Sequence, residues 1–166
     1  MRPGGAGSTS GPTIRSYCDQ LDATWTTSLE IVRDLGGWAW AVPIKLNNLA
    51  DFASELGRPG EAERHARQTL ELSSEIGDRI TTAFSLAALA VAARARGDHE
   101  LAGRLWGSIE AEEERTFLGQ WPAYRRFYAG RAADAASPAF ERARNSGKGL
   151  TLEEAVTLAL EPSGPA

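Results

Sequence analysis

The residues in this sequence with the clearest capacity for chemistry are the glutamates of the stretch LWGSIEAEEERTFLGQWP, Leu105 to Pro122. On a helix, Glu110 shares a face with Glu113 and Glu114, so that two carboxylates there could hold a cation or act as an acid–base pair. Calcium sites need several converging oxygens, and transition metals usually need His or Cys, which this run lacks. We therefore interpret EAEEER, Glu110 to Arg115, as the solvent-exposed face of a helix.

Other reactive side chains lack the neighbours that catalysis or ligand binding requires. His65 and His99 lie outside any HExxH or CxxC pattern and are predicted to be surface residues. The thiol of Cys18 has only Arg15 nearby to activate it and is interpreted as a small packing group. The sequence shows no GxSxG phrase, and SELGRPGEAER lacks the lysine and hydroxyl pair of a phosphate-binding loop. We predict no catalytic, cofactor-binding or metal-ligating residues, no cofactor, and no enzymatic activity.

Composition restricts the partners and the compartment. A net charge of -4 disfavours direct binding to nucleic acid, because no broad basic surface is available to neutralise phosphates. A single cysteine cannot form a disulfide within the chain, which is consistent with a reducing compartment. The most apolar stretch, Ala83 to Arg96, is shorter than the roughly 20 residues that span a bilayer. We expect a cytoplasmic chain with no membrane contact.

Helical periodicity dominates the chain after a Gly-, Ser- and Pro-rich leader, which we expect to be flexible over residues 1–13. A helix is predicted from Ile14 to Leu35, because four apolar residues fall on one face: Leu21, Trp25, Leu29 and Val32. Pro43 suits the first turn of a second helix that runs to about Leu56. Trp25 and Trp106 are predicted core residues, whereas Trp38 and Trp40 are equally consistent with packing and with an exposed contact pair.

An internal repeat appears when the chain is compared with itself at an offset of forty residues. The matched pairs are Leu46 and Leu86, Leu49 and Leu89, Ala50 and Ala90, Ala53 and Ala93, Gly57 and Gly97, Ala62 and Ala102, and Ala66 and Trp106. Each copy has a helix, a glycine turn and a second helix, so we predict two helical hairpins over residues 38–77 and 79–116. Such hairpins must stack on one another, because a single hairpin cannot bury its apolar face.

This order of large and small residues resembles the tetratricopeptide repeat. The resemblance implies an all-α solenoid of stacked antiparallel hairpins, with helices longer than usual because the period exceeds the standard one by about six residues. The repeat domain is expected to span residues 14–160. A divergent C-terminal helical cap is predicted over residues 121–160, with helix starts at Ser137 and at Thr151, which has Glu154 three residues on. Residues 161–166 are expected to form a frayed tail.

A second resemblance covers about the last seventy residues. The phrases GRLWG, Gly103 to Gly107, and LTLEEAVTLAL are similar to the C-terminal end of the repeat region in LuxR- and AfsR-type signal-transduction ATPases of high-GC bacteria. The ATPase and helix-turn-helix modules of that family are absent from this sequence. The resemblance implies a role in bacterial signalling or transcription regulation, and leaves open whether the chain is a stand-alone relative or a remnant of a larger regulator.

Stacked hairpins would present one inner face from the first helix of each unit. We predict that a binding surface lies there, formed by Ile44, Asn47, Asn48, Asp51, Phe84, Ala88, Val91 and Arg94. The favoured function is a non-catalytic module that binds a protein or peptide, with possible self-association, and the alternative is a small-molecule effector sensor. An open groove lined by Asn47, Asn48 and Arg94 would favour the first, and an enclosed apolar pocket around Phe84 and Trp106 would favour the second.

Overall fold

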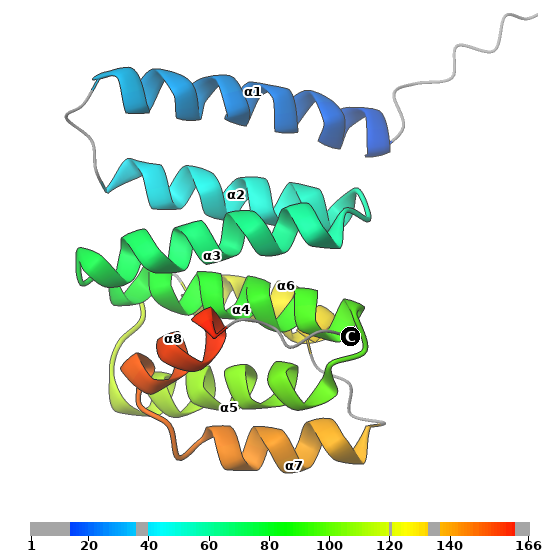
Figure 1. Ribbon diagram of the computed structural model, residues 1–166, viewed down its shortest axis with the longest axis vertical. Helices are drawn as coiled ribbons and strands as arrows, with labels where there is room; N and C mark the ends of the chain where they lie inside the picture. The colour runs from blue at the N-terminus through cyan, green and yellow to red at the C-terminus, as the bar shows by residue number, and fades with distance from the viewer. Residues whose placement is uncertain (1–13, 36–39, 120, 133–136, 162–166) are drawn as a thin grey trace, which may run out of the picture.

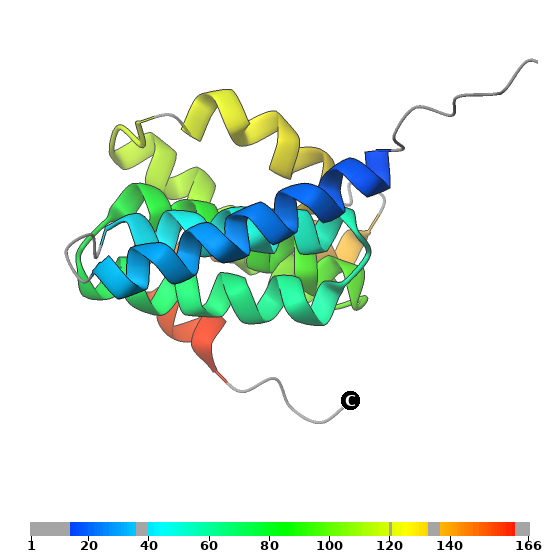
Figure 2. The same cartoon turned by 90° about the horizontal axis from the view of Figure 1, so that it is seen from above.

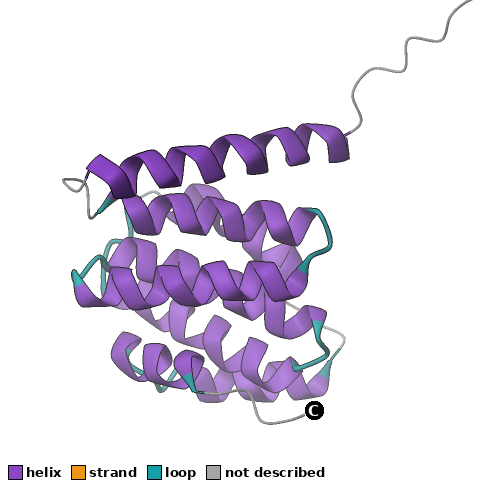
Figure 3. Cartoon of the chain, turned by 45° about the horizontal axis from the view of Figure 1, so that its top comes forward, coloured by secondary structure: helices purple, strands orange, loops and turns teal. Residues whose placement is uncertain are grey.

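A computed structural model describes residues 14–35, 40–119, 121–132 and 137–161. These ranges contain helices and no strand, which confirms the all-α prediction (Figures 1 and 3). The helices are α1 (Ile14–Leu35), α2 (Ala41–Glu55), α3 (Pro59–Glu75), α4 (Arg79–Ala95), α5 (His99–Arg115), α6 (Trp121–Ala132), α7 (Pro138–Gly147) and α8 (Leu152–Leu160). The predicted leader and the residues after Glu161 lie outside the described ranges, as does Trp38.

The turns between α2 and α5 recur every twenty residues, at Gly57, Gly77 and Gly97. Each glycine has a positive φ of 71°, 71° and 82° respectively, a conformation that costs other residues more. The amide after each glycine donates to a carbonyl five residues earlier, for example Asp98 N to the Ala93 carbonyl oxygen at 2.9 Å. These turns end each helix and reverse the chain, so that helices of 15 to 17 residues stack antiparallel.

The stack runs from α1 through α2, α3, α4 and α5 to α7 (Figure 1). Apart from the turn glycines, the matched positions of the repeat are buried in both copies, including the pairs Leu46 and Leu86, and Ala66 and Trp106. One large apolar cluster joins α2 to α8, whereas α1 attaches through a smaller cluster in which Leu29 packs with Leu46 and Leu49. The small residues of the repeat allow neighbouring helices to approach, and the large residues fill the remaining space.

The C-terminal helices do not all close the end of the stack as a terminal cap would. Helix α7 packs on α5 at the end, but α6 lies along α4 and α8 lies against α3, α4 and α5. Figure 2 shows α6 and α8 on opposite faces of the stack. The predicted helix starts are confirmed: Ser137 caps α7 by accepting from Phe140 N, and Thr151 with Glu154 forms a capping box on α8.

None of the helices in the described part of the chain is both long and apolar enough to cross a membrane.

Candidate functional site

A pocket of about 370 Å³ lies between α2, α4 and α6, and we call it the α2–α4–α6 pocket. Its volume falls within the range of small-molecule sites. Five of the eight residues predicted for the inner face line it: Ile44, Asn47, Asn48, Asp51 and Phe84. The other lining residues are Ile80, Thr81, Gly119, Tyr124 and Tyr128, and sequence reasoning did not place them there.

The remaining three predicted residues lie further along α4. Val91 and Arg94 line a separate pocket of about 470 Å³ with residues of α6, and Ala88 is buried beneath α6. Arg94 donates from Nη1 to the Arg131 carbonyl oxygen at 2.8 Å, which engages it with α6. Helix α6 therefore divides the expected single groove into two parts, and Trp106 lies in the core instead of at the α2–α4–α6 pocket.

Tyr128 forms the polar end of the α2–α4–α6 pocket together with two residues of α2. Its hydroxyl lies 2.8 Å and 3.0 Å from the two carboxylate oxygens of Asp51, and Asn47 Nδ2 lies 3.2 Å from the same hydroxyl. These contacts join residues that are 77 and 81 positions apart in the sequence. They attach α6 to the first hairpin at the middle of α2.

The fold also changes the acidity of Asp51. Burial raises the pKa of its carboxyl to about 7, although the hydrogen bond from Tyr128 and the charge of Arg131 oppose the rise. Burial dominates because removing a carboxylate from water costs free energy. The hydrogen bond from Tyr128 and the charge of Arg131 recover only part of that cost. Asp51 therefore changes charge close to neutral pH.

The acidic run on α5 was predicted to face solvent, and this prediction is wrong for two of its residues, Glu110 and Glu112. Glu110 is 6% exposed and Glu112 is 1% exposed, whereas Glu114 is exposed. Arginines of α4, α6 and α7 pair with these carboxylates and compensate for their burial. The sequence pattern indicated a helix face correctly but could not show which elements would cover it.

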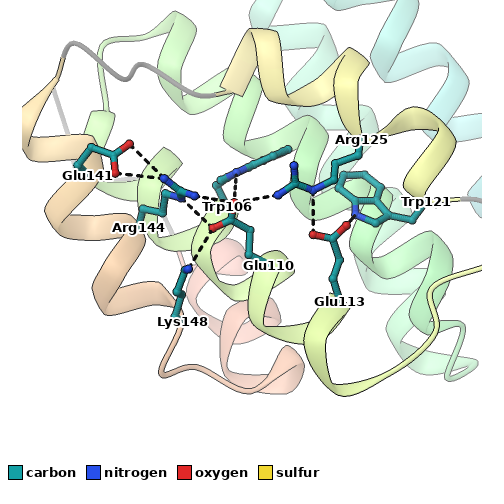
Figure 4. A network of polar contacts seen from close by, with 8 residues as sticks. All are labelled: Trp106, Glu110, Glu113, Trp121, Arg125, Glu141, Arg144 and Lys148. Atoms are coloured by element: carbon teal, nitrogen blue, oxygen red, sulfur yellow. Dashed lines mark hydrogen bonds and ion pairs between the residues drawn. The ribbon is translucent and has the colours of Figure 1, made fainter.

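Glu110 lies at the centre of the network in Figure 4. Arg144 of α7 donates to both of its oxygens, at 2.8 Å and 2.9 Å, and Arg125 of α6 donates at 3.0 Å. Burial raises the pKa of the Glu110 carboxyl, but the hydrogen bond and charge of Arg144, together with Lys148 and Arg125, outweigh it and lower the pKa overall. The carboxylate is thus held ionised as a structural link among three helices.

Two neighbouring acids make similar links. Arg79 of α4 donates from Nε to Glu112 at 2.9 Å and from Nη1 to Glu153 of α8 at 3.0 Å. Glu113 accepts from Trp121 Nε1 and from Arg125 Nε. These pairs attach α5 to the first turn of α4, to α6 and to α8, so the acidic run stabilises the arrangement of helices.

We predict that Glu110→Gln lowers the free energy of unfolding by about 1.5 kcal/mol, because the amide keeps the shape but removes the charge that offsets Arg125 and Arg144. The value is modest because both arginine side chains are partly exposed and water solvates them after the change. Urea unfolding measures the loss. Glu114→Gln, an exposed glutamate of the same run, is the control and should change stability little; an equal loss in both variants would contradict the structural role.

The remaining predictions on single residues have mixed outcomes. Trp106 is buried as predicted, Trp25 is half-buried against the α1–α2 cluster, and Trp40 is exposed. His65 and His99 are half-buried, and the Nδ1 atom of each is shielded from solvent. The side chain of Cys18 lies outside the described residues.

Among the described side chains, no group of three or more His, Cys, Asp or Glu residues could hold a metal ion.

The comparisons with known proteins agree with the repeat architecture. The tetratricopeptide repeat family model matches residues 42–104, which cover α2, α3, α4 and the start of α5. No curated protein and no solved structure matches the chain. The family match and the helical stack together make this an all-α, tetratricopeptide-like solenoid.

Proposed function

We propose that this chain is a non-catalytic module that binds a protein or peptide partner within a bacterial signalling or transcription-regulatory system. Tetratricopeptide repeats generally mediate contacts between proteins, and the region matching that family forms most of the stack. The regulatory setting rests on the resemblance of GRLWG and LTLEEAVTLAL to regulator repeat regions. A cytoplasmic location, and the lack of direct nucleic-acid contact expected from the acidic charge, belong to the same proposal.

The observation that carries the proposal is the apolar rim of the α2–α4–α6 pocket. Ile44, Ile80 and Tyr124 line the pocket and are also exposed, at 39%, 37% and 50%. Large apolar side chains that surround a hollow and reach solvent are typical of docking sites, because a partner can cover the rim and fill the hollow. The rim combines residues from α2, α4 and α6, so it exists only in the folded chain.

We predict that Ile80→Glu removes partner binding, because it places a charge on the apolar rim where a partner would have to desolvate it. The wild-type chain and the variant would each be crosslinked in native cells, and captured proteins compared by quantitative mass spectrometry. The captured amount of at least one partner should be lower by about tenfold or more with the variant than with wild type. A decrease of this size corresponds to the loss of one well-packed contact residue.

Ile76→Glu provides a matched control. Ile76 is an exposed isoleucine four positions earlier, at the end of α3, and it does not line the pocket. Its variant should retain the partners of the wild-type chain. Equal capture by all three proteins would contradict docking at the rim, and equal loss in both variants would indicate a general effect of added charge.

A second candidate function, small-molecule effector sensing, is favoured by the dimensions and lining of the same pocket. Its volume of about 370 Å³ suits a small organic ligand, and mainly apolar walls surround a few polar groups. A bound effector would contact α2, α4 and α6 together and would stabilise the position of α6. Ligand-observed NMR with small organic probes, with Phe84→Ala as a variant that removes one wall, tests whether this pocket binds such molecules.

A further inference from the structure

The polar end of the α2–α4–α6 pocket contains more hydrogen-bond acceptors than donors. Tyr128 has one hydroxyl proton, and its position between both oxygens of Asp51 directs that proton to the carboxylate. The Tyr128 oxygen therefore accepts from Asn47 Nδ2, which fixes the orientation of the amide. Oδ1 of Asn47 is then buried without a hydrogen-bond partner among the described residues, on a side chain that is only 7% exposed.

Such an acceptor is costly to leave unpaired, because burial removes its hydrogen bond to water. The Asp51 carboxylate has capacity for further hydrogen bonds, since an ionised carboxylate offers about four acceptor positions and Tyr128 supplies one proton. A ligand that brings donors would therefore satisfy groups that the protein alone does not satisfy. A ligand that brings only hydrogen-bond acceptors would add to the excess of acceptors in the pocket.

Charges around Asp51 favour a cation at this position. None of the α4 residues that line the two hollows beside Asp51 is charged; they are Ile80, Thr81, Phe84, Ala88 and Val91. On α6, Arg131 acts on Asp51 electrostatically, but its guanidinium is paired with Glu55. Tyr128 of α6 is neutral, because burial and the charge of Asp51 raise the pKa of its hydroxyl well above the usual value.

The walls of the pocket indicate what the apolar part of the ligand would be. The rings of Phe84 and Tyr124 meet edge to face with centroids 5.5 Å apart, and Ile44 and Ile80 complete the apolar lining. Aromatic rings attract cations as well as apolar groups, so the wall and the carboxylate favour the same kind of ligand. An organic cation with a compact apolar or aromatic body matches both parts of the pocket.

We propose that the α2–α4–α6 pocket binds a small organic ammonium ion, with the N–H donors directed to Asp51 and Asn47 and the apolar body packed between Phe84, Tyr124 and the two isoleucines. This inference rests on the second candidate function and names its ligand class. The ammonium replaces water around the carboxylate with charge-assisted hydrogen bonds. The pocket volume of about 370 Å³ leaves room for the ring of a compact amine, whereas a lysine side chain would bring only a narrow methylene chain.

Phenethylamine, which is protonated at neutral pH, and phenethyl alcohol, its neutral counterpart of similar shape, provide the test by isothermal titration calorimetry at pH 8. The amine should bind about tenfold or more tightly than the alcohol, as expected for a charge-assisted hydrogen bond in a partly buried site. Asp51→Asn should reduce this preference to about one while the alcohol still binds. Asp34→Asn, an exposed aspartate on α1, should leave the preference unchanged.

The pH dependence gives a second readout on the wild-type chain. Because the Asp51 carboxyl must be ionised, affinity for the amine should fall about tenfold from pH 8 to pH 6, whereas affinity for the alcohol should not change. Equal binding of amine and alcohol, or a preference that persists in Asp51→Asn, overturns the cation inference and leaves small-molecule sensing standing. If neither phenethylamine nor phenethyl alcohol binds, both the cation inference and small-molecule sensing by this pocket are overturned. Tighter binding of Nα-acetyl-lysine amide than of phenethylamine overturns the assignment to a free amine.

Discussion

Gly107→Ala should lower the free energy of unfolding by about 3 kcal/mol, the upper part of the range for an overpacked interior. A β-carbon at this position would lie 2.0 Å from the carbonyl oxygen of Arg144 and 2.9 Å from its carbonyl carbon. Both atoms belong to the backbone of α7, so no side-chain rotation relieves the clash. The helices α5 and α7 would have to separate, which would weaken the Arg144–Glu110 ion pair as well.

The close crossing of α5 and α7 depends on glycine from both helices. A β-carbon on Gly103, one turn before Gly107 on the same face, would lie 2.4 Å from the Phe140 carbonyl oxygen. A β-carbon on Gly147 of α7 would lie 2.1 Å from the Arg104 carbonyl oxygen. The phrase GRLWG thus has a packing reason: its glycines admit the backbone of α7, and Trp106 between them fills the core.

Gly130→Ala is the matched control, because it is the same substitution inside a helix with no atom within 4 Å of the added β-carbon. It should stabilise the chain by about 0.5–1 kcal/mol, the usual advantage of alanine over glycine in a helix. Urea unfolding followed by circular dichroism measures both variants. If Gly107→Ala also gained stability, the close contact of α5 and α7 would be wrong.

Asp51→Asn should raise the free energy of unfolding by about 3 kcal/mol above pH 7, and should have little effect near pH 4. In the folded chain burial raises the pKa of Asp51 from 3.8 to about 7. Between these values the folded state holds a proton that the unfolded state releases, so stability falls as the pH rises from about 4 to 7 and is then constant. Asparagine keeps the shape, avoids the buried charge and still accepts from Tyr128.

Urea unfolding of wild type and variant at intervals from pH 4.5 to pH 8.5 measures this difference directly. The comparison removes the contribution of other titrating acids, such as Glu110, whose pKa is lowered and which therefore stabilises the fold above its unfolded pKa. Asp34→Asn, at an exposed site, should show no pH-dependent gain. A difference between Asp51→Asn and wild type that is flat with pH would show that the Asp51 carboxyl is not buried as described.

The sequence by itself determined the hairpins. Apolar residues at helical spacing, glycines at the turns and the forty-residue offset of large and small residues are local signals, and each predicts an element without knowledge of its neighbours. The helix starts at Ser137 and Thr151 were predictable for the same reason, since a cap involves only three or four consecutive residues. Five inner-face residues could be grouped because the repeat relates α2 to α4.

Tertiary structure alone decided where α6 lies and what the acids do. The aromatic residues of α6 were visible in the sequence, but their position on α4 and the contact of Tyr128 with Asp51 depend on contacts across 77 residues. Glu110 likewise looks like a surface residue until α6 and α7 bring Arg125 and Arg144 to it. A charged residue is buried only where distant partners offset its desolvation, and the periodicity of one helix contains no information about those partners.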